Sequence, residues 1–383
     1  MITTDWLARL VRFPSVSSAP NLDLVGVLVA ALEPLGWQVE TFPDPTGQKA
    51  AILARIGPAA PGGLMLSGHL DVVPAEGQAW SLPPFELTRR GTRLYGRGTT
   101  DMKGFVAAVM ALAARLRPAG LRRPLYIALS YDEEVGCTGI RPMLAEIARR
   151  ALRPDLVLVG EPTSMALGLG HKGKTAWRAV CHGEPRHSAE APLAVSALHL
   201  AADLLAGLRA LQAELERDGH REPGYSVPWS TVHAGVLTAG TTVNIVPARA
   251  ELVFEARYPA GEDAAALAAR IRALADGVDR AARPRGGVAL SDLTAYPALA
   301  ADPQAPAIRR LAACLPAGMP DCRLSFGTEA GLFAAALGVP VAVCGPGDMA
   351  QGHQPDEFIE EDELHRCDLL LDRAVASFCG SQG

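Results

Sequence analysis

Two adjacent carboxylates, Glu133 and Glu134, follow the apolar run PLYIALS, which is typical of a buried strand, and Asp132 stands just before them. Like charges packed side by side raise one another's pKa and repel. A cation bound at the end of this strand would remove the repulsion. The pair therefore directs attention to metal chemistry and to proton transfer.

Other ionisable side chains follow other expected strands. The run GLMLSGHLD ends in His69 and Asp71, PDLVLVGEP ends in Glu161, and a Gly-rich loop after VPVAVC carries His353. Asp101 lies in YGRGTTDMKG, where a long helix begins. Ligands of open parallel sheets bind beyond the carboxyl ends of the strands. We therefore expect five segments to deliver these side chains to one edge of one sheet.

Each of these residues also has a structural interpretation. Asp101 fits a helix N-cap, because acids are favoured there. A single His after a strand is more often structural than a ligand, and Glu161 fits an ordinary loop carboxylate. Independent structural roles do not explain one shared sheet edge.

The combination of residue types indicates the metal. Two His with several carboxylates suit Zn²⁺ or Co²⁺ better than Ca²⁺ or Mg²⁺. Three carboxylates and two His are too many for one tetrahedral site that keeps a water. They suit two metals about 3.5–4 Å apart that share a bridging carboxylate. One acid of the Glu pair is then left over to act as general base.

The elements that must position these residues form a large α/β domain with an insertion. Residues 1–171 and 294–383 alternate helices with strands that are apolar throughout, which predicts a mixed, mostly parallel sheet flanked by helices. Residues 172–293 have the order strand, helix, strand, strand, helix, strand, with the first helix expected from about residue 191 to 216. That order predicts an inserted α+β domain of the split βαβ, ferredoxin-like kind.

Composition excludes several other classes of protein. The net charge of −5 over 383 residues argues against a nucleic-acid partner. The sequence has no uninterrupted apolar run of 18 residues and no signal-peptide pattern at its start, so we expect no membrane partner. Its seven cysteines have no CxxC spacing, which argues against a disulfide framework and predicts a cytoplasmic location.

The motifs GHLDVVP, YGRGTTDMKG, DEEVG, VGEPT and a late Gly-rich His resemble the dinuclear-zinc aminoacylase and carboxypeptidase family. The resemblance covers nearly the whole chain and implies a zinc-exopeptidase-like fold. Three stretches, GHKGKTAWR, SFGTEAGLF and VAVCGPGDMAQGHQPDEFI, resemble the acetylornithine deacetylase branch. The runs LAVSA and RYPAGED depart from the family pattern.

The resemblance implies the role of each residue at the sheet edge. Two divalent metals, with Zn²⁺ preferred and Co²⁺ as the alternative, would be held by His69, Asp101, Glu134, Glu161 and His353. Asp101 would bridge the metals, with His69 and Glu161 on one of them and Glu134 and His353 on the other.

Two further acids would support this centre. Asp71 would hydrogen-bond His69 and fix its tautomer; its alternative role is a turn cap. Glu133 would take a proton from the metal-held water, so that hydroxide attacks the amide carbonyl, and would then return a proton to the leaving amine.

Residues outside the metal centre are expected to bind the substrate. The resemblance implies that His187 crosses from a partner subunit to stabilise the oxyanion, whereas its alternative role is an ordinary helix start. Asn244 and Arg257 lie on or beside strands of the inserted domain. Arg257 suits capture of a carboxylate, but it could instead pair with Glu255. Thr328 and Glu329, in SFGTEAG, are expected near the substrate's amines.

The resemblance thus predicts a hydrolase of N-acyl amino acids. The expected reaction converts N2-acetyl-L-ornithine to L-ornithine and acetate, in arginine biosynthesis, in a homodimer formed through the inserted domain. A succinyl-diaminopimelate desuccinylase and a glutamate-releasing carboxypeptidase are the alternatives within the family. A non-catalytic homologue that binds metal or peptide is the alternative outside it.

Overall fold

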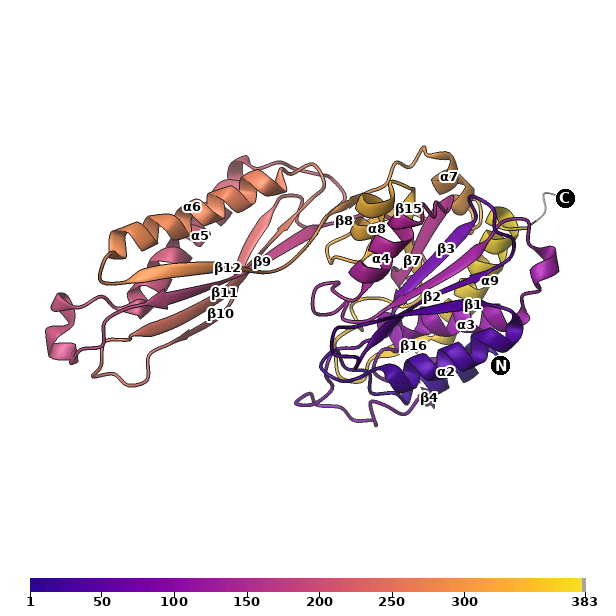
Figure 1. The fold of residues 1–383 in the computed structure, drawn as a ribbon, viewed down its shortest axis with the longest axis horizontal. Helices are drawn as coiled ribbons and strands as arrows, with labels where there is room; N and C mark the ends of the chain where they lie inside the picture. Colours follow the sequence, from indigo (N-terminus) through magenta and orange to yellow (C-terminus); the bar gives the residue numbers. More distant parts are fainter. Residues whose placement is uncertain (381–383) are drawn as a thin grey trace. The chain divides into compact units, whose positions relative to one another are not determined.

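The computed structural model describes residues 1–380 and divides the chain into two compact units (Figure 1). Unit 1 comprises Met1–Gly170, Ala300–Arg323 and the chain from Thr328 onward; unit 2 comprises His171–Leu299 and Leu324–Gly327. The sequence predicted an insertion over residues 172–293. The return to unit 1 comes later because β12 (Gly287–Tyr296) runs past residue 293 and the short strand β13 (Leu299–Ala300) already belongs to the large sheet.

The large sheet of unit 1 is mixed, which confirms the predicted fold class. It runs in the order β1-β2-β6-β3-β7-β15-β8-β13, with β14 beside β8. The strands β6, β3, β7 and β15 are parallel to their neighbours in that series, whereas β1, β2 and β6 pair antiparallel. The bounds are β1 (Gln38–Pro43), β2 (Ala50–Ile56), β3 (Leu64–His69), β6 (Leu125–Ser130), β7 (Leu156–Pro162), β8 (Leu167–His171), β14 (Asp321–Leu324) and β15 (Val341–Gly345).

Helices cover both faces of this sheet, which is why its central strands are apolar throughout. On one face lie α1 (Thr3–Val11), α2 (Leu22–Leu32), α3 (Gly104–Arg115), α7 (Pro306–Ala312) and α9 (Glu361–Phe378), which share one hydrophobic cluster. On the other lie α4 (Ile140–Arg149) and α8 (Ala330–Leu337). None of the helices in the described part of the chain is long and apolar enough to span a bilayer.

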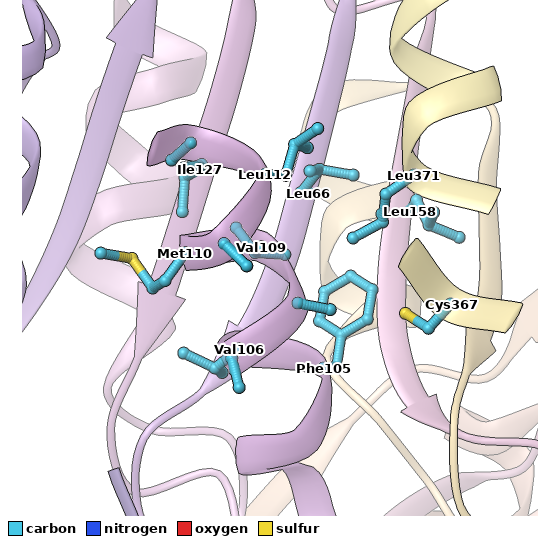
Figure 2. Packing of buried hydrophobic residues seen from close by; sticks show 14 of the residues in the cluster. Leu66, Phe105, Val106, Val109, Met110, Leu112, Ile127, Leu158, Cys367 and Leu371 are labelled. Atoms are coloured by element: carbon cyan, nitrogen blue, oxygen red, sulfur yellow. The ribbon is translucent and has the colours of Figure 1, made fainter. Parts of the chain in front are cut away.

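Helix α3 is the centre of that hydrophobic cluster. Its residues from Gly104 to Ala113 are all buried, so it is apolar on every side rather than amphipathic. Figure 2 shows its side chains in one cluster with Leu66 of β3, Ile127 of β6 and Leu158 of β7, with α9 alongside. Because α3 begins at Gly104, three residues after Asp101, this packing anchors one candidate ligand segment to the sheet.

A small antiparallel sheet joins two segments that the site needs. Strand β5 (Arg93–Tyr95) pairs with β4 (Thr88–Arg90) and with β16 (Phe358–Glu360). The pairing places the chain just before Asp101 beside the chain just after His353. The three residues of β16 carry too little pattern to predict a strand from the sequence.

Unit 2 is an antiparallel sheet in the order β10-β11-β9-β12. Along the chain it runs β9 (Gly173–His182), α5 (Ala197–Asp218), β10 (Thr231–Ala239), β11 (Arg249–Tyr258), α6 (Ala264–Ala282) and β12. Alternate residues of β9 and β11 pack under the two helices, including Trp177 and Phe254, whose rings stack 5.6 Å apart. Helix α5 begins at Ala197 rather than near residue 191, because Pro192 lies in a 3-10 turn, Ser188–Leu193.

Candidate metal centre

The carboxylate of Asp101 lies between two histidines. Its Oδ1 is 3.0 Å from Nε2 of His69, and its Oδ2 is 3.2 Å from Nε2 of His353. The side chain is only 3% exposed. A carboxylate that offers one oxygen to each of two nitrogen ligands can bridge two cations.

Two further carboxylates complete the cluster. Oε1 of Glu161 is 3.6 Å from Nε2 of His69, and Oε2 of Glu134 is 3.0 Å from Nε2 of His353. Donor atoms of His69, Asp101 and Glu134 lie within 4.8 Å of one another, as do those of His69, Glu133 and Glu161. The five predicted ligands therefore meet at one place, and Glu133 lies there as well.

The parallel sheet explains this convergence. His69 is the last residue of β3, Glu161 lies at the end of β7, and the Glu133–Glu134 pair follows β6. These three strands are adjacent and parallel, with His69 directly opposite Ser130. Their carboxyl ends consequently share one edge, as the sequence analysis expected.

Asp101 does not cap a helix. It lies in the turn Thr99–Lys103 with φ −120° and ψ 95°, and Lys103 is the N-cap of α3. The structural interpretation that the sequence left open for Asp101 is therefore wrong, and its carboxylate is free to face the histidines.

Burial and mutual charge dominate the electrostatics of the cluster. Burial raises the pKa of Glu133 and of Glu161 well above the ordinary range. Burial and the charge of Asp101 raise the pKa of Glu134 to about 7. Hydrogen bonds with Asp101 and Glu134 raise the pKa of His353 to about 10. The protein thus retains protons among these donors at neutral pH.

This donor set fits a divalent metal. The nitrogens and carboxylate oxygens are mostly buried and point at one another, and a cation among them would take the place of the retained protons. Imidazole and carboxylate together suit Zn²⁺ and neighbouring transition metals rather than Ca²⁺ or Mg²⁺.

Comparison with known proteins agrees with this geometry. The sequence of residues 65–377 matches the family described as "Peptidase family M20/M25/M40". The chain belongs to this family. It is a hydrolase that acts on amide bonds, as the sequence predicted.

Two similar proteins are named acetylornithine deacetylase. An acetylornithine deacetylase of Edwardsiella ictaluri is 31% identical over 97% of this chain and 96% of its own length. One of Photorhabdus laumondii is 29% identical over the same shares. An M20 family metallo-carboxypeptidase of Sulfolobus solfataricus has the same fold, with a TM-score of 0.80, 17% identity and 98% of each chain covered.

Asp71 holds the loop of the Glu pair. Its Oδ1 accepts from the backbone amide of Glu133 at 3.1 Å, and its Oδ2 accepts from that of Glu134 at 3.3 Å and from the Ser17 hydroxyl at 2.6 Å. Nδ1 of His69 lies 2.9 Å from the backbone oxygen of Asp71 but 3.5 Å from its carboxylate. The tautomer of His69 is thus set mainly by a main-chain carbonyl.

The three acids after β6 have different partners. Asp132 forms an ion pair with Lys49 at 2.7 Å. Oε1 of Glu133 accepts from the thiol of Cys137 at 3.2 Å. Glu134 faces His353. Asp132 therefore has a structural partner, in keeping with its lack of a predicted catalytic role.

Sequence reasoning missed the carboxylate that holds the Asp101 turn. Glu357 accepts from the amides of Gly98, Thr100 and Asp101, at 3.0, 2.9 and 3.1 Å. Its only signal in the sequence is an acid four residues after His353, and such a signal is too weak to predict a contact with residue 101.

Three predicted substrate residues lie in unit 2. His187 precedes the turn Ser188–Leu193, where its Nδ1 accepts from the Ala189 amide at 3.2 Å. The amide of Ser188 donates to the backbone oxygen of Asn244 at 3.0 Å, so His187 and Asn244 are neighbours. Arg257 pairs with Glu255 at 2.7 Å, which is the structural alternative considered for it.

Thr328 and Glu329 are buried in this structure. The hydroxyl of Thr328 accepts from the Ala330 amide at 3.0 Å at the start of α8. Glu329 is 1% exposed, its Oε1 has no hydrogen-bond partner within residues 1–380, and burial raises its pKa to about 8. Contact of either side chain with a substrate's amines stays a prediction.

Proposed function

We propose that this M20 hydrolase deacetylates N2-acetyl-L-ornithine, giving L-ornithine and acetate for arginine biosynthesis. The observation that carries the reaction class is the buried Asp101 carboxylate, which faces His69 and His353 with one oxygen each. The substrate is supported by relatives named acetylornithine deacetylase that match 97% of the chain.

The cluster would hold two divalent ions, Zn²⁺ in preference to Co²⁺. Asp101 would lie between them, with His69 and Glu161 as the ligands on one side and Glu134 and His353 on the other. Bound there, the metals would lower the pKa of a water towards about 7 and polarise the carbonyl of the scissile amide.

Glu133 would move the proton. Its carboxylate lies beside the donors of His69 and Glu161, and burial raises its pKa, which suits a group that holds a proton between two steps. It would accept a proton from the attacking water and deliver it to the leaving nitrogen. Asp71, through the Glu133 amide, and Cys137, through Oε1, would hold the carboxylate in position.

Unit 2 would supply contacts to the rest of the substrate. Arg257 is the proposed partner of the substrate carboxylate and would exchange Glu255 for it. His187 and Asn244, which are neighbours, would stabilise the oxyanion from the second subunit of a homodimer. Thr328 and Glu329 are the proposed partners of the side-chain amine.

Exposed apolar side chains support the proposed dimer. Strand β10 is an edge strand of the unit 2 sheet and carries the exposed residues Val236 and Leu237. Val243 and Ile245, beside His187, are also exposed. A second copy could extend the sheet along β10 and cover these residues. A cytoplasmic enzyme is also proposed, because the cysteines of the chain are free thiols.

The test is acetate release from N2-acetyl-L-ornithine by protein loaded with Zn²⁺ or Co²⁺. Succinyl-diaminopimelate and peptides ending in glutamate are assayed in parallel. Higher kcat/KM on either of those would move the substrate assignment to the corresponding branch of the family. Metal binding without turnover on any of them would support the non-catalytic alternative.

A further inference from the structure

Two loops that carry candidate ligands are joined by a buried ion pair. Arg97 precedes the Asp101 turn, and Glu357 follows His353. Nη1 of Arg97 lies 2.8 Å from Oε2 of Glu357, and both side chains are 1% exposed. Neither residue is a candidate ligand, and neither has a role in the proposed reaction.

Glu357 fixes the Asp101 side of this connection. Its Oε2 accepts from the amide of Gly98, and its Oε1 accepts from the amides of Thr100 and Asp101. Both carboxylate oxygens are therefore committed to the turn that aims the Asp101 side chain.

Arg97 fixes the His353 side. Its Nη1 also donates to the backbone oxygen of Gln354 at 3.3 Å. Its Nη2 donates to Oε1 of Gln78, and Nε2 of Gln78 donates to the backbone oxygen of His353 at 3.0 Å. The indole of Trp80 donates to the same Gln78 oxygen at 3.1 Å, and Arg97 lies 5.0 Å from its ring centroid.

Stability alone does not account for this arrangement. A buried ion pair loses much of its attraction to the removal of both charges from water. Nε of Arg97 is also buried without a hydrogen-bond partner in the described part of the chain, which is unfavourable. The pair and its hydrogen bonds instead hold the His353 loop in position. This loop lies outside the parallel strands, and the side chain of His353 is 42% exposed, so the sheet alone does not fix it.

We propose that Arg97, Glu357 and Gln78 form a clamp that sets the separation of Asp101 and His353 and thereby the affinity of the second metal. They are positioning residues and do not touch the substrate. The inference rests on the proposed function, because that function assigns Asp101 and His353 to a metal. The side of the centre with His353 and Glu134 depends on the clamp, whereas the side with His69 and Glu161 is built on adjacent strands.

Gln78 offers a selective test, because its two amide atoms have different partners. A Gln78→Glu side chain can still accept from Arg97 and Trp80 but cannot donate to the His353 carbonyl. A Gln78→Leu side chain loses both links. The matched control is Gln38→Leu on strand β1, because the side-chain oxygen of Gln38 also accepts from an arginine, Arg55, at 2.6 Å.

The measurement is calorimetric titration of the metal-free proteins with Zn²⁺, supported by Co²⁺ absorption spectra. For Gln78→Glu and Gln78→Leu we expect one of two binding steps to weaken by about 10–100-fold. The other step and the thermal midpoint of the metal-free protein should stay as in the parent and in Gln38→Leu. Parent-like affinities for both steps would overturn the clamp, and so would equal weakening of both steps.

The same titration separates this inference from the proposed function. A parent protein that binds fewer than two metals would overturn the dinuclear centre itself. Two metals in the parent, with no change in either Gln78 variant, would overturn only the clamp. Glu357→Gln is the second variant: it keeps one acceptor oxygen for the Asp101 turn and loses the charge that faces Arg97, and the clamp requires that it weaken the same binding step.

Discussion

The carboxylate of Asp71 accepts a hydrogen bond from the backbone amide of Glu133 at 3.1 Å. The adjacent acids Glu133 and Glu134 are thus held through their main chain by the side chain of Asp71. Burial would raise the pKa of Asp71, but contacts with His69, Ser17 and the Glu133 amide outweigh burial and lower it. Asp71 therefore stays ionised and can only accept hydrogen bonds.

Replacing Asp71 by Asn should loosen the Glu pair. The amide group of Asn would turn a donor toward one of the two N–H groups that Asp71 now satisfies. We expect Asp71→Asn to reduce kcat/KM and metal affinity by about 10–100-fold. Ser17→Ala, which removes only one partner of Asp71, is the control and should have a smaller effect. Unchanged kinetics in Asp71→Asn would contradict this positioning role.

Glu133→Gln should separate proton transfer from metal binding. We expect kcat to fall by about 10²–10⁴-fold, the usual contribution of a general base, with the metal content unchanged. Asp132→Asn is the neighbouring control, since Asp132 pairs with Lys49 instead. Because Glu133 lies within reach of His69 and Glu161, a variant that loses metal would show that Glu133 is a ligand.

Glu329 should make the metal-free protein less stable as pH rises. Its pKa is raised from an ordinary 4.5 to about 8 by burial, so folding favours the neutral acid. That contribution is fully present below about pH 4.5 and is lost as pH rises through about 8. Thermal midpoints between these limits should decline with pH in the parent and less steeply in Glu329→Gln.

The control for this pH series is Asp203→Asn, a change of an exposed acid on α5. Its midpoints should follow those of the parent at every pH. If Glu329→Gln also followed the parent across the whole range, the buried carboxyl would not be the source of the slope.

Gly160 should not tolerate a side chain. A Cβ there would lie 2.0 Å from Cγ of Phe105, and the next residue is Glu161. We expect Gly160→Ala to lower the free energy of unfolding by about 1–3 kcal/mol and to weaken metal binding by displacing Glu161. Gly26→Ala in α2 meets nothing within 4 Å and should stabilise the helix by up to about 1 kcal/mol. Denaturant midpoints measure both, and equal midpoints would refute the packing argument.

The strand-borne part of the site was predictable from sequence. His69, Glu161 and the Glu pair follow apolar runs, and the ends of parallel strands share one edge by geometry. The supporting contacts were not predictable. Glu357 accepts a hydrogen bond from the Asp101 turn, and Gln78 donates one to His353. In each case the two residues are more than 250 positions apart in the sequence. No local period or spacing signals such pairs, and the same holds for the segment Leu324–Gly327, which joins unit 2.

The chain leaves unit 1 through β8 and returns through β13, and these strands are neighbours in the large sheet, with the Ala301 amide 2.8 Å from the Leu169 oxygen. An insertion whose two ends meet on adjacent strands can be lengthened, trimmed or exchanged with little disturbance to the host domain. Evolution can thus change the insert while the ligand-bearing strands are inherited intact. Such modularity would let one ancestral hydrolytic core diversify into enzymes of different specificity.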